Sequence, residues 1–367
     1  MGVMCFICII PGDGCGKEVT NESIGIIDAL REQLDIEYEV CEAGAEYYLK
    51  TGRAWESETI ERAEEADAIL FGAVGRDDVR KPDGTTPAGE VIFGLRNGLD
   101  LYANVRPIRL YPGILQRLSG RLGRFWRVED VDIVIVRENT EGLYVRIGGI
   151  SNIGGVALDN RIITKKGSSR ITEFAAEIAL KRRAHLTCVD KSNVLMGDRY
   201  FRENFRRITR LKKYERIYTD FYYVDAFAMR LLTDPANFDV VVMPNLYGDI
   251  ITDIGAVLQG GLGIAPSGNY GEKNAMFEPV HGSAPDIAGK GIVNPSASLL
   301  SLSMLLEYLS RKVKEDTKDF LRASEAIEDA VVKTITAGIK TPDLGGNATT
   351  WDVGRCVRKE VISLLKS

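Results

Sequence analysis

The sequence predicts an α/β fold with parallel strand segments, and two features carry that prediction. Short runs of apolar, β-branched residues alternate with segments whose apolar residues recur at helical spacing. That order of elements is typical of a sheet with helices packed on it. At 367 residues, with 45% apolar and 27% charged side chains, the chain has an ordinary globular composition and is long enough for two domains.

The expected elements follow from apolar periodicity and turn residues. Predicted strands cover 5–10, 37–42, 67–75, 131–136 and 238–243. The stretch 187–193 is predicted to be a strand followed by polar residues, and 217–227 a strand with a turn around Asp225. Predicted helices cover about 17–34, 57–65, a segment from Glu90, a segment capped by Ser168 or Ser169, a segment from near Gly248, and 297–309, 324–339 and the C-terminal stretch. The glycine-rich stretch 145–165 is typical of two short strands or an arm.

Composition also indicates where the chain acts. A formal net charge of −5 gives no general attraction to nucleic acid or anionic membranes. The apolar run 3–10 lacks the basic flank and cleavage site of a signal peptide, and the run 297–306 is too short to span a bilayer. The basic stretch 202–213 has no interleaved aromatic residues and indicates a solvated helix face. We therefore expect a cytoplasmic protein that binds neither nucleic acid nor membranes.

Two patterns near the N-terminus are poor matches to known sites. The glycines at 12, 14 and 16 do not meet the G-x-G-x-x-G spacing of a Rossmann dinucleotide loop. Cys5 and Cys8 would point to opposite faces of a strand, which argues against a redox or zinc pair. We expect buried free thiols instead.

Three arginines indicate an anionic substrate. Arg96 follows Ile92 by one helical turn, so an apolar side chain and a guanidinium share a surface. Arg106 precedes a proline in an extended segment, and Arg137 ends an apolar strand. An arginine there adds little stability but can hold a carboxylate through two hydrogen bonds. Each alone is typical of a surface residue, whereas three at element ends favour binding of an acid.

Asp249 and Asp253 are four residues apart on a predicted helix, so their carboxylates share a face. Two like charges this close repel each other unless a cation lies between them, and hard divalent cations prefer oxygen ligands. The alternative is that the helix N-terminus alone favours the two acids. Because the chain has only two histidines, acid–base chemistry must rest mainly on Tyr, Lys, Asp, Glu or a metal.

Seven motifs, in order along nearly the whole chain, resemble the β-decarboxylating dehydrogenases. That family includes the isocitrate, isopropylmalate, homoisocitrate, and tartrate or D-malate dehydrogenases. The motifs are PGDG at 11–14, LR…LYANVRP at 95–107, RENTEGLY at 137–144, VDKSNVL at 189–195, YVDA at 223–226, NLYGDIITD at 245–253, and EPVHGSAPDIAGK at 278–290 with NP at 294–295.

The resemblance implies the isocitrate/isopropylmalate dehydrogenase-like fold, a non-Rossmann α/β fold with two domains around a central mixed sheet. A cofactor-side domain would comprise 1–101 plus 260–367, and a dimerisation and substrate/metal domain would comprise 102–259. It also implies a homodimer in which 145–165 is an intersubunit arm. Each active site would be completed by three residues of the other subunit: the partner's Lys191, the partner's Asn193 and the partner's Asp225.

The resemblance further implies the chemistry, which is oxidation of a 2-hydroxy acid followed by loss of a carboxylate. The substrate's carboxylates would be clamped by Arg96, Arg106 and Arg137, with further substrate contacts from Asn193 and Asp225. A Mg²⁺ or Mn²⁺ ion would be held by Asp225, Asp249 and Asp253. It would stabilise the developing enolate as a Lewis acid. Lys191 would take the hydroxyl proton, and Tyr144 would supply a proton to the enol carbon.

NAD is the cofactor that the resemblance favours. The loop 278–290 is similar to the family's adenosine site, and the expected NAD contacts are Glu278, His281, Gly282, Ser283, Ala284, Asp286, Ile287 and Asn294. Asp286 stands where NAD-preferring members keep an acid, which accepts hydrogen bonds from ribose hydroxyls and repels a 2′-phosphate. The NADP-preferring isocitrate enzymes have a lysine-tyrosine pair there.

The substrate is expected to be (2R,3S)-3-isopropylmalate, converted to 4-methyl-2-oxopentanoate and CO₂ as in leucine biosynthesis. Ile92 and Phe93 should face the variable substituent, and an apolar lining suits an isopropyl group better than a third carboxylate. The ENTEGLY wording at 138–144 and Gly89 depart from bacterial isopropylmalate enzymes. Homoisocitrate, isocitrate and tartrate or D-malate therefore remain alternatives. A non-catalytic regulatory subunit is an alternative of another class, but such chains usually lose the tyrosine, the lysine or an arginine, all of which are present.

Overall fold

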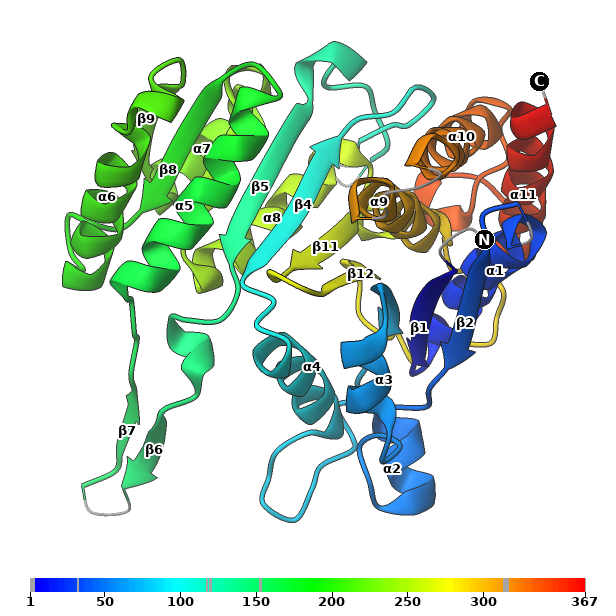
Figure 1. Cartoon of the computed structure of the whole chain (residues 1–367), viewed down its shortest axis with the longest axis horizontal. Helices are drawn as coiled ribbons and strands as arrows, with labels where there is room; N and C mark the ends of the chain where they lie inside the picture. The colour runs from blue at the N-terminus through cyan, green and yellow to red at the C-terminus, as the bar shows by residue number, and fades with distance from the viewer. Residues whose placement is uncertain are drawn as a thin grey trace. The chain divides into compact units, whose positions relative to one another are not determined.

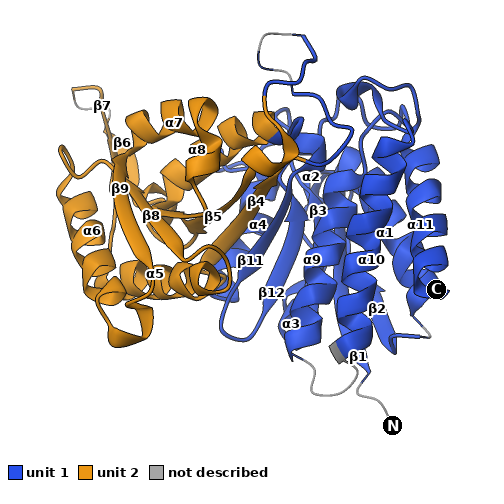
Figure 2. Cartoon of the chain, turned by 90° about the horizontal axis from the view of Figure 1, so that it is seen from above, with its two compact units in different colours: residues 1–100, 111–125, 259–367 blue, residues 101–110, 126–258 orange. Residues whose placement is uncertain are grey.

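The computed structural model describes residues 4–31, 33–116, 118, 121–151, 154–312 and 317–366 (Figure 1). The chain divides into two compact units (Figure 2). Unit 1 comprises Met1–Asp100, Tyr111–Phe125 and Gln259–Ser367, and unit 2 comprises Leu101–Leu110 and Trp126–Leu258. The predicted second domain, 102–259, included Tyr111–Phe125, whereas this segment belongs to unit 1.

The described strands of unit 1 follow the order β2-β1-β3-β12-β11, with bounds β1(Cys5–Gly12), β2(Ile36–Val40), β3(Ala68–Ala73), β11(Pro266–Tyr270) and β12(Ala275–Pro279). The neighbours are parallel except β11, which is antiparallel to β12. The helices are α1(Cys15–Leu30), α2(Ala45–Thr51), α3(Thr59–Glu65), α4(Pro87–Gly98), α9(Ser296–Lys312), α10(Thr317–Thr336) and α11(Thr350–Lys366). β3 is buried at every position, as expected for a strand covered on both faces.

The main sheet strands of unit 2 follow the order β4-β5-β10-β8-β9, with bounds β4(Ala103–Arg109), β5(Asp132–Glu138), β8(His185–Asp190), β9(Tyr218–Tyr223) and β10(Val240–Met243). Among these strands β4 and β5 are antiparallel neighbours, and the other neighbours are parallel. The helices α5(Lys165–Leu180) and α6(Met196–Thr209) pack together, as do α7(Val224–Thr233) and α8(Asn245–Ala256), and the two pairs lie on opposite sides of the strands (Figure 2). The parallel strands therefore send their carboxyl ends to one edge, where loops can carry ligands.

A two-stranded arm leaves unit 2 as β6(Gly148–Ser151) and β7(Val156–Asp159), which pair antiparallel (Figure 1). This confirms the short strands predicted within 145–165, of which residues 152 and 153 lie outside the described residues. Gly148 permits the close pairing, because a Cβ there would approach the carbonyl oxygen of Leu158 to 2.1 Å. Every described arm residue in the two strands is exposed.

Several predicted boundaries were wrong for identifiable reasons. The helix expected from Gly248 begins at Asn245, directly after Pro244. The helix expected to be capped by Ser168 or Ser169 begins at Lys165, because the hydroxyl of Thr164 accepts from the Gly167 N–H at 3.0 Å. Those two serines instead donate back to carbonyls one turn earlier.

All six cysteines are free thiols and five of them are buried, as predicted. No helix among the described ranges combines the length and apolarity that crossing a membrane requires.

Candidate active site

Unit 2 brings five predicted residues together beside the first turns of α8: Arg106, Arg137, Tyr144, Asp249 and Asp253. They come from β4, β5, the short 3-10 helix Leu143–Val145 and α8. The strands β5 and β10 are parallel neighbours, with Arg137 in register with Met243. Because α8 follows β10 at once, its acids come to lie beside the arginine of the adjacent strand.

Arg137 is the fixed point of this cluster, with only 1% of its side chain exposed. Its Nε and Nη2 atoms donate to Asn245 Oδ1 at 2.9 and 2.7 Å, and its Nη1 donates to Asp249. The guanidinium also lies 5.1 Å from the ring centre of Tyr144. The hydroxyl of Tyr144 donates to the other oxygen of Asp249, Oδ2, at 2.5 Å. Asp249 thus links a buried cation to the predicted proton donor.

Arg106 is also buried and approaches both acids of α8. Its Nη2 lies 3.6 Å from Asp249 Oδ1 and its Nη1 lies 3.8 Å from Asp253 Oδ1. Its orientation is fixed by Asn104 Oδ1 at 2.9 Å and Thr252 Oγ1 at 2.6 Å. Desolvation, followed by repulsion from Asp249, raises the pKa of Asp253 against the opposing effect of Arg106.

Lys191 and Asp225 form a second group in unit 2. Lys191 follows β8 directly and Asp225 lies in the first turn of α7, which follows β9. Since β8 and β9 are parallel neighbours, with Asp190 opposite Tyr223, the two side chains meet at 2.7 Å. The hydrogen bond from Lys191 is the largest cause that lowers the pKa of Asp225. Asn193, two residues further on, is exposed.

The predicted metal ligands fit a hard divalent cation in part. Asp249 and Asp253 present oxygen donors from one helix face. Burial is the largest cause that raises the pKa of Asp253, and repulsion from Asp249 adds to it. Their side chains keep 40% and 62% of their surface exposed, so the oxygens are accessible. Within the described part of the chain, no three His, Cys, Asp or Glu side chains converge as a metal site. Asp225, the third predicted ligand, pairs with Lys191.

Unit 1 carries the remaining residues that were predicted to bind the substrate, and they lie on α4. Arg96 is buried, and its Nη2 donates to Glu278 Oε1 at 3.0 Å, an oxygen that also accepts from Asn269 at 2.7 Å. Glu278, predicted to contact NAD, therefore directs its carboxylate at Arg96. Ile92 and Phe93, one turn before Arg96, are both half-buried.

The predicted cofactor loop packs against the turn at the start of α1. The N–H of Cys15 donates to the Ser283 carbonyl at 2.8 Å, and its thiol, whose pKa burial raises to about 11, lies 3.3 Å from the Gly282 carbonyl. A Cβ at Gly14 would come within 2.4 Å of Ser283 O, so this approach requires glycine. His281 Nδ1 lies 3.0 Å from Gly282 O, and desolvation lowers the pKa of that histidine.

The rest of the predicted cofactor set is divided between exposed and packed positions. Gly282, Ala284 and Asp286 are exposed, and Ala284 adopts a positive φ of 39°. Ile287 packs on the buried cluster Cys15, Val19 and Val293. Asn294 is buried and held by Asp343 and the Ser296 N–H, each at 3.0 Å.

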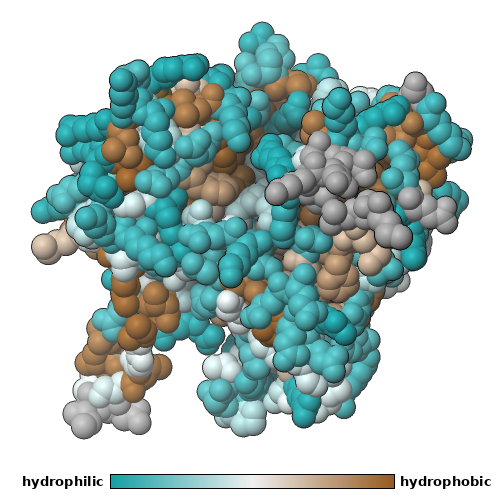
Figure 3. Space-filling view, in the orientation of Figure 1, coloured by the Kyte–Doolittle hydropathy of each residue, from teal (hydrophilic) through white to brown (hydrophobic). Residues whose placement is uncertain are grey.

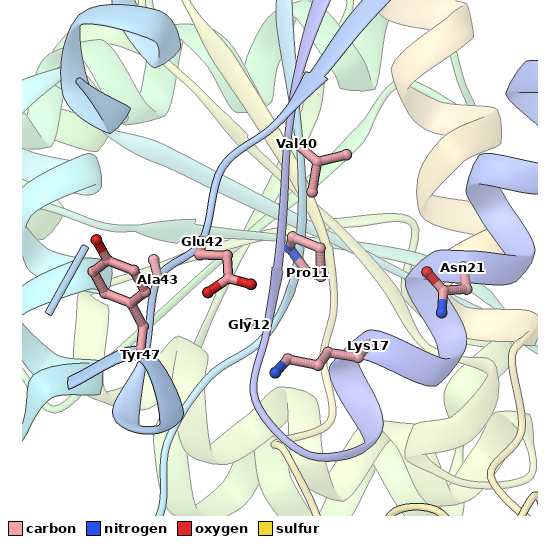
Figure 4. Close-up of a pocket in the computed structure, with 8 residues that line it drawn as sticks. All are labelled: Pro11, Gly12, Lys17, Asn21, Val40, Glu42, Ala43 and Tyr47. Atoms are coloured by element: carbon pink, nitrogen blue, oxygen red, sulfur yellow. The ribbon is translucent and has the colours of Figure 1, made fainter. Parts of the chain in front are cut away.

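A pocket of about 200 Å³ opens near the carboxyl ends of β1 and β2 (Figure 4). It is lined by Pro11, Gly12, Lys17, Asn21, Val40, Glu42, Ala43 and Tyr47, none of which was predicted as a site residue. The ammonium of Lys17 is paired with Glu46 at 2.6 Å. Nothing in this lining matches the predicted chemistry.

Several residues that shape the unit 2 cluster were not predicted as site residues. Asn245 and Thr252 orient the two arginines, although both lie inside the motif at 245–253. Glu138 is buried and accepts from the N–H groups of Thr140 and Glu141 at 2.9 and 2.8 Å, which folds the loop that leads to Tyr144. Only contacts across the fold assign these roles, so the local pattern could not supply them.

Comparison with known proteins matches the whole chain to one family. The profile described as isocitrate/isopropylmalate dehydrogenase matches residues 6–357. A homoisocitrate dehydrogenase of Methanocaldococcus jannaschii is 46% identical over 357 residues, which cover 96% of each chain. A 3-isopropylmalate/3-methylmalate dehydrogenase of the same organism is 42% identical over 361 residues, covering 97% of this chain and 98% of the relative. A solved isocitrate dehydrogenase from Methylococcus capsulatus superimposes with a TM-score of 0.85 at 33% identity, covering 98% of this chain and 99% of that one.

Proposed function

This chain belongs to the isocitrate/isopropylmalate dehydrogenase family of β-decarboxylating dehydrogenases, and we propose that it oxidises and decarboxylates 3-isopropylmalate with NAD. The observation that carries the proposal is the cluster in unit 2. Two buried arginines, a tyrosine hydroxyl and two acids of one helix face meet there. That donor set suits a substrate with two carboxylates and a hydroxyl, held together with a divalent cation.

The chain's own residues would bind the charged groups of the substrate and transfer its protons. Arg106 and Arg137 hold the carboxylates, and their fixed geometry orients C2 and C3 of the substrate. Lys191 removes the proton of the C2 hydroxyl as the C2 hydrogen leaves as hydride. The C3 carboxylate then departs as CO₂, and Tyr144 protonates the enol carbon that remains.

Asp249 and Asp253, with the partner's Asp225, would hold Mg²⁺ or Mn²⁺, and the loop 278–290 would hold NAD. When bound, NAD accepts the hydride and the cation stabilises the negative charge that develops on the substrate oxygens. The exposed carboxylate of Asp286 favours NAD over NADP, because it would repel a 2′-phosphate. Within unit 1, Glu278 orients Arg96, which was also predicted to bind a substrate carboxylate.

The substituent at C3 is the least constrained part of the proposal. Ile92 and Phe93 are half-buried and apolar, which favours an isopropyl group over a carboxylate. The relative named as a 3-isopropylmalate/3-methylmalate dehydrogenase supports that choice. The homoisocitrate dehydrogenase, at 46% identity, supports homoisocitrate as the second candidate. With the first substrate, the chain would serve leucine biosynthesis.

A homodimer with shared active sites accounts for the exposed apolar side chains of unit 2. The arm exposes 81% of Ile150, 56% of Val156 and 59% of Leu158, and its surface is strongly hydrophobic (Figure 3). Val194 and Met196, which closely follow Lys191, are 64% and 81% exposed. Apolar surface of this extent is typical of a protein interface. Such an interface would carry Lys191, Asn193 and Asp225 toward the partner's cluster.

The proposal is tested by assaying the purified protein with NAD and Mg²⁺ or Mn²⁺ on 3-isopropylmalate, homoisocitrate, isocitrate, D-malate and tartrate. We expect the highest kcat/KM with 3-isopropylmalate, and 4-methyl-2-oxopentanoate and CO₂ as products. Tyr144→Phe and Lys191→Ala serve as controls that should still bind NAD. Best turnover on homoisocitrate would replace the proposed substrate, and turnover on none would favour a regulatory subunit.

A further inference from the structure

We propose that Asp198 is a positioning residue that fixes the backbone of Lys191 and couples it to the arm. The proposal rests on the proposed function for the role of Lys191. Asp198 lies in the first turn of α6 and its side chain is completely buried. Its contacts come from three separate segments of unit 2, none of which is adjacent to another in the sequence.

The carboxylate of Asp198 is shared among those three segments. Its Oδ2 accepts from the N–H of Lys191 at 2.8 Å and from the hydroxyl of Tyr247 at 2.9 Å. Its Oδ1 forms an ion pair with Arg161 Nη2 at 2.5 Å. The guanidinium of Arg161 also lies 5.2 Å from the ring centre of Tyr247, which closes the network.

Each partner belongs to a different part of the proposed machinery. Arg161 follows β7, at the root of the arm, where Ile162 and Gly142 form a β-bridge. Tyr247 lies in the first turn of α8, the helix that carries Asp249 and Asp253. Lys191 is the proposed base. One buried acid therefore joins the arm, the base and the helix of the proposed metal ligands.

Burial of a carboxylate costs free energy unless its oxygens are paired. Breaking one of the contacts of Asp198 should therefore destabilise this network. The backbone N–H that Asp198 holds belongs to Lys191 itself, and the next residue is held too, because Asp190 accepts from the Ser192 N–H at 2.8 Å. The side chain of Lys191 therefore extends from a backbone that is held at two consecutive N–H groups. Loss of one anchor would displace the ammonium, and a misplacement of about 1 Å can cost roughly 100-fold in rate.

Asp239 provides a matched control in the same unit. It is also completely buried, accepts from Arg182 Nε at 2.7 Å and accepts from the backbone N–H of Arg183 at 2.9 Å. Its partners lie outside the segment that carries Lys191. Asp239→Asn and Asp198→Asn thus remove the same kind of buried ion pair, and only the second loosens the proposed base.

The test compares Asp198→Asn, Arg161→Gln and Asp239→Asn with the wild-type protein. Hydrogen exchange of the peptide that spans 189–195 should accelerate roughly tenfold in Asp198→Asn, less in Arg161→Gln, and not at all in Asp239→Asn. The kcat of Asp198→Asn should fall about 10- to 100-fold with little change in KM. Its isotope effect with C2-deuterated substrate should rise, because hydride transfer becomes limiting.

Each outcome bears on one proposal. Unchanged exchange at 189–195 in Asp198→Asn overturns the inference whatever the activity. Faster exchange with unchanged kcat and isotope effect overturns the positioning role. A wild-type protein that is inactive on every acid contradicts the proposed function, and the exchange experiment still tests the anchor. If Asp198→Asn does not fold, Arg161→Gln combined with Tyr247→Phe removes two of the three contacts and is judged by the same measurements.

Discussion

Lys191 and Asp225 form an ion pair that favours the charged form of the Asp225 carboxyl. The hydrogen bond from the ammonium lowers the pKa of Asp225, so the carboxyl stays charged to lower pH than an isolated one. A lowered pKa in the folded state stabilises the fold above the carboxyl's unfolded pKa, and that contribution disappears as pH falls through the folded value. Because the Asp225 side chain is 68% exposed, solvent screens the pair and the contribution is small.

Replacing Lys191 by methionine should therefore raise the pKa of Asp225 toward its ordinary value in the metal-free protein. The carboxyl carbon of Asp225, followed by NMR through an acid titration, measures the change. Asp78 is the internal reference, since Arg76 lowers its pKa and Lys191 does not contribute. An unchanged titration of Asp225 in the variant would show that the two side chains are not paired in solution.

At the scale of elements, α8 shows which features of a helix could be predicted from the sequence and which could not. The motif at 245–253 predicted a helix with two acids on one face, and the structure has that helix. Its start was misplaced by three residues, because Asn245 uses its side chain to hold Arg137, a contact over more than one hundred residues. The short α2 was not predicted, because its first two N–H groups are accepted by the buried carboxylate of Asp13, far away in the sequence. Apolar periodicity predicted buried strands such as β1, β3, β5 and β10, whereas β11 and β12 were not predicted. Caps and orienting contacts made across the fold could not be inferred locally either.

Gly248 sets the distance between α8 and β5. A Cβ at this position would come within 2.5 Å of the Cβ and Cγ atoms of Arg137, a side chain that is fully packed. Helical glycine usually costs stability relative to alanine, so a close approach is the reason to keep it here. The absence of a side chain lets the acids of α8 reach the guanidinium.

Gly248→Ala should accordingly destabilise the protein by about 1–3 kcal/mol through overpacking, and raise KM by displacing Arg137. Urea denaturation and steady-state kinetics measure the two effects. Gly98→Ala is the matched control, because Gly98 ends the helix α4 and a Cβ there meets nothing within 4 Å. The control should be neutral or more stable by up to about 1 kcal/mol. Equal behaviour of the two variants would mean that α8 moves freely to admit the methyl group.

At the scale of the whole molecule, the two groups of unit 2 have different surroundings. The cluster around Asp249 is built on two buried arginines and has exposed Ile250 beside it. Two apolar residues that are more exposed, Val194 and Met196, closely follow Lys191. The proposed base, Lys191, and the proposed metal ligand, Asp225, thus lie next to an exposed apolar surface. This is the position expected of residues that one subunit contributes to the active site of its partner. If two chains share each active site, then mixing two differently inactivated variants should restore activity.

Tyr144→Phe and Lys191→Ala should each be inactive alone and should regain activity when mixed under conditions that exchange subunits. In a mixed dimer, one site receives both missing side chains from the intact copies and the other site receives neither. Random exchange makes half of the dimers mixed, so recovery should approach about a quarter of wild-type activity. Mixing each variant with itself is the control, and sedimentation measures the dimer fraction. If subunits exchange but activity does not recover, Lys191 and Tyr144 belong to a site formed by one chain. The arm would then have no role in completing the active site.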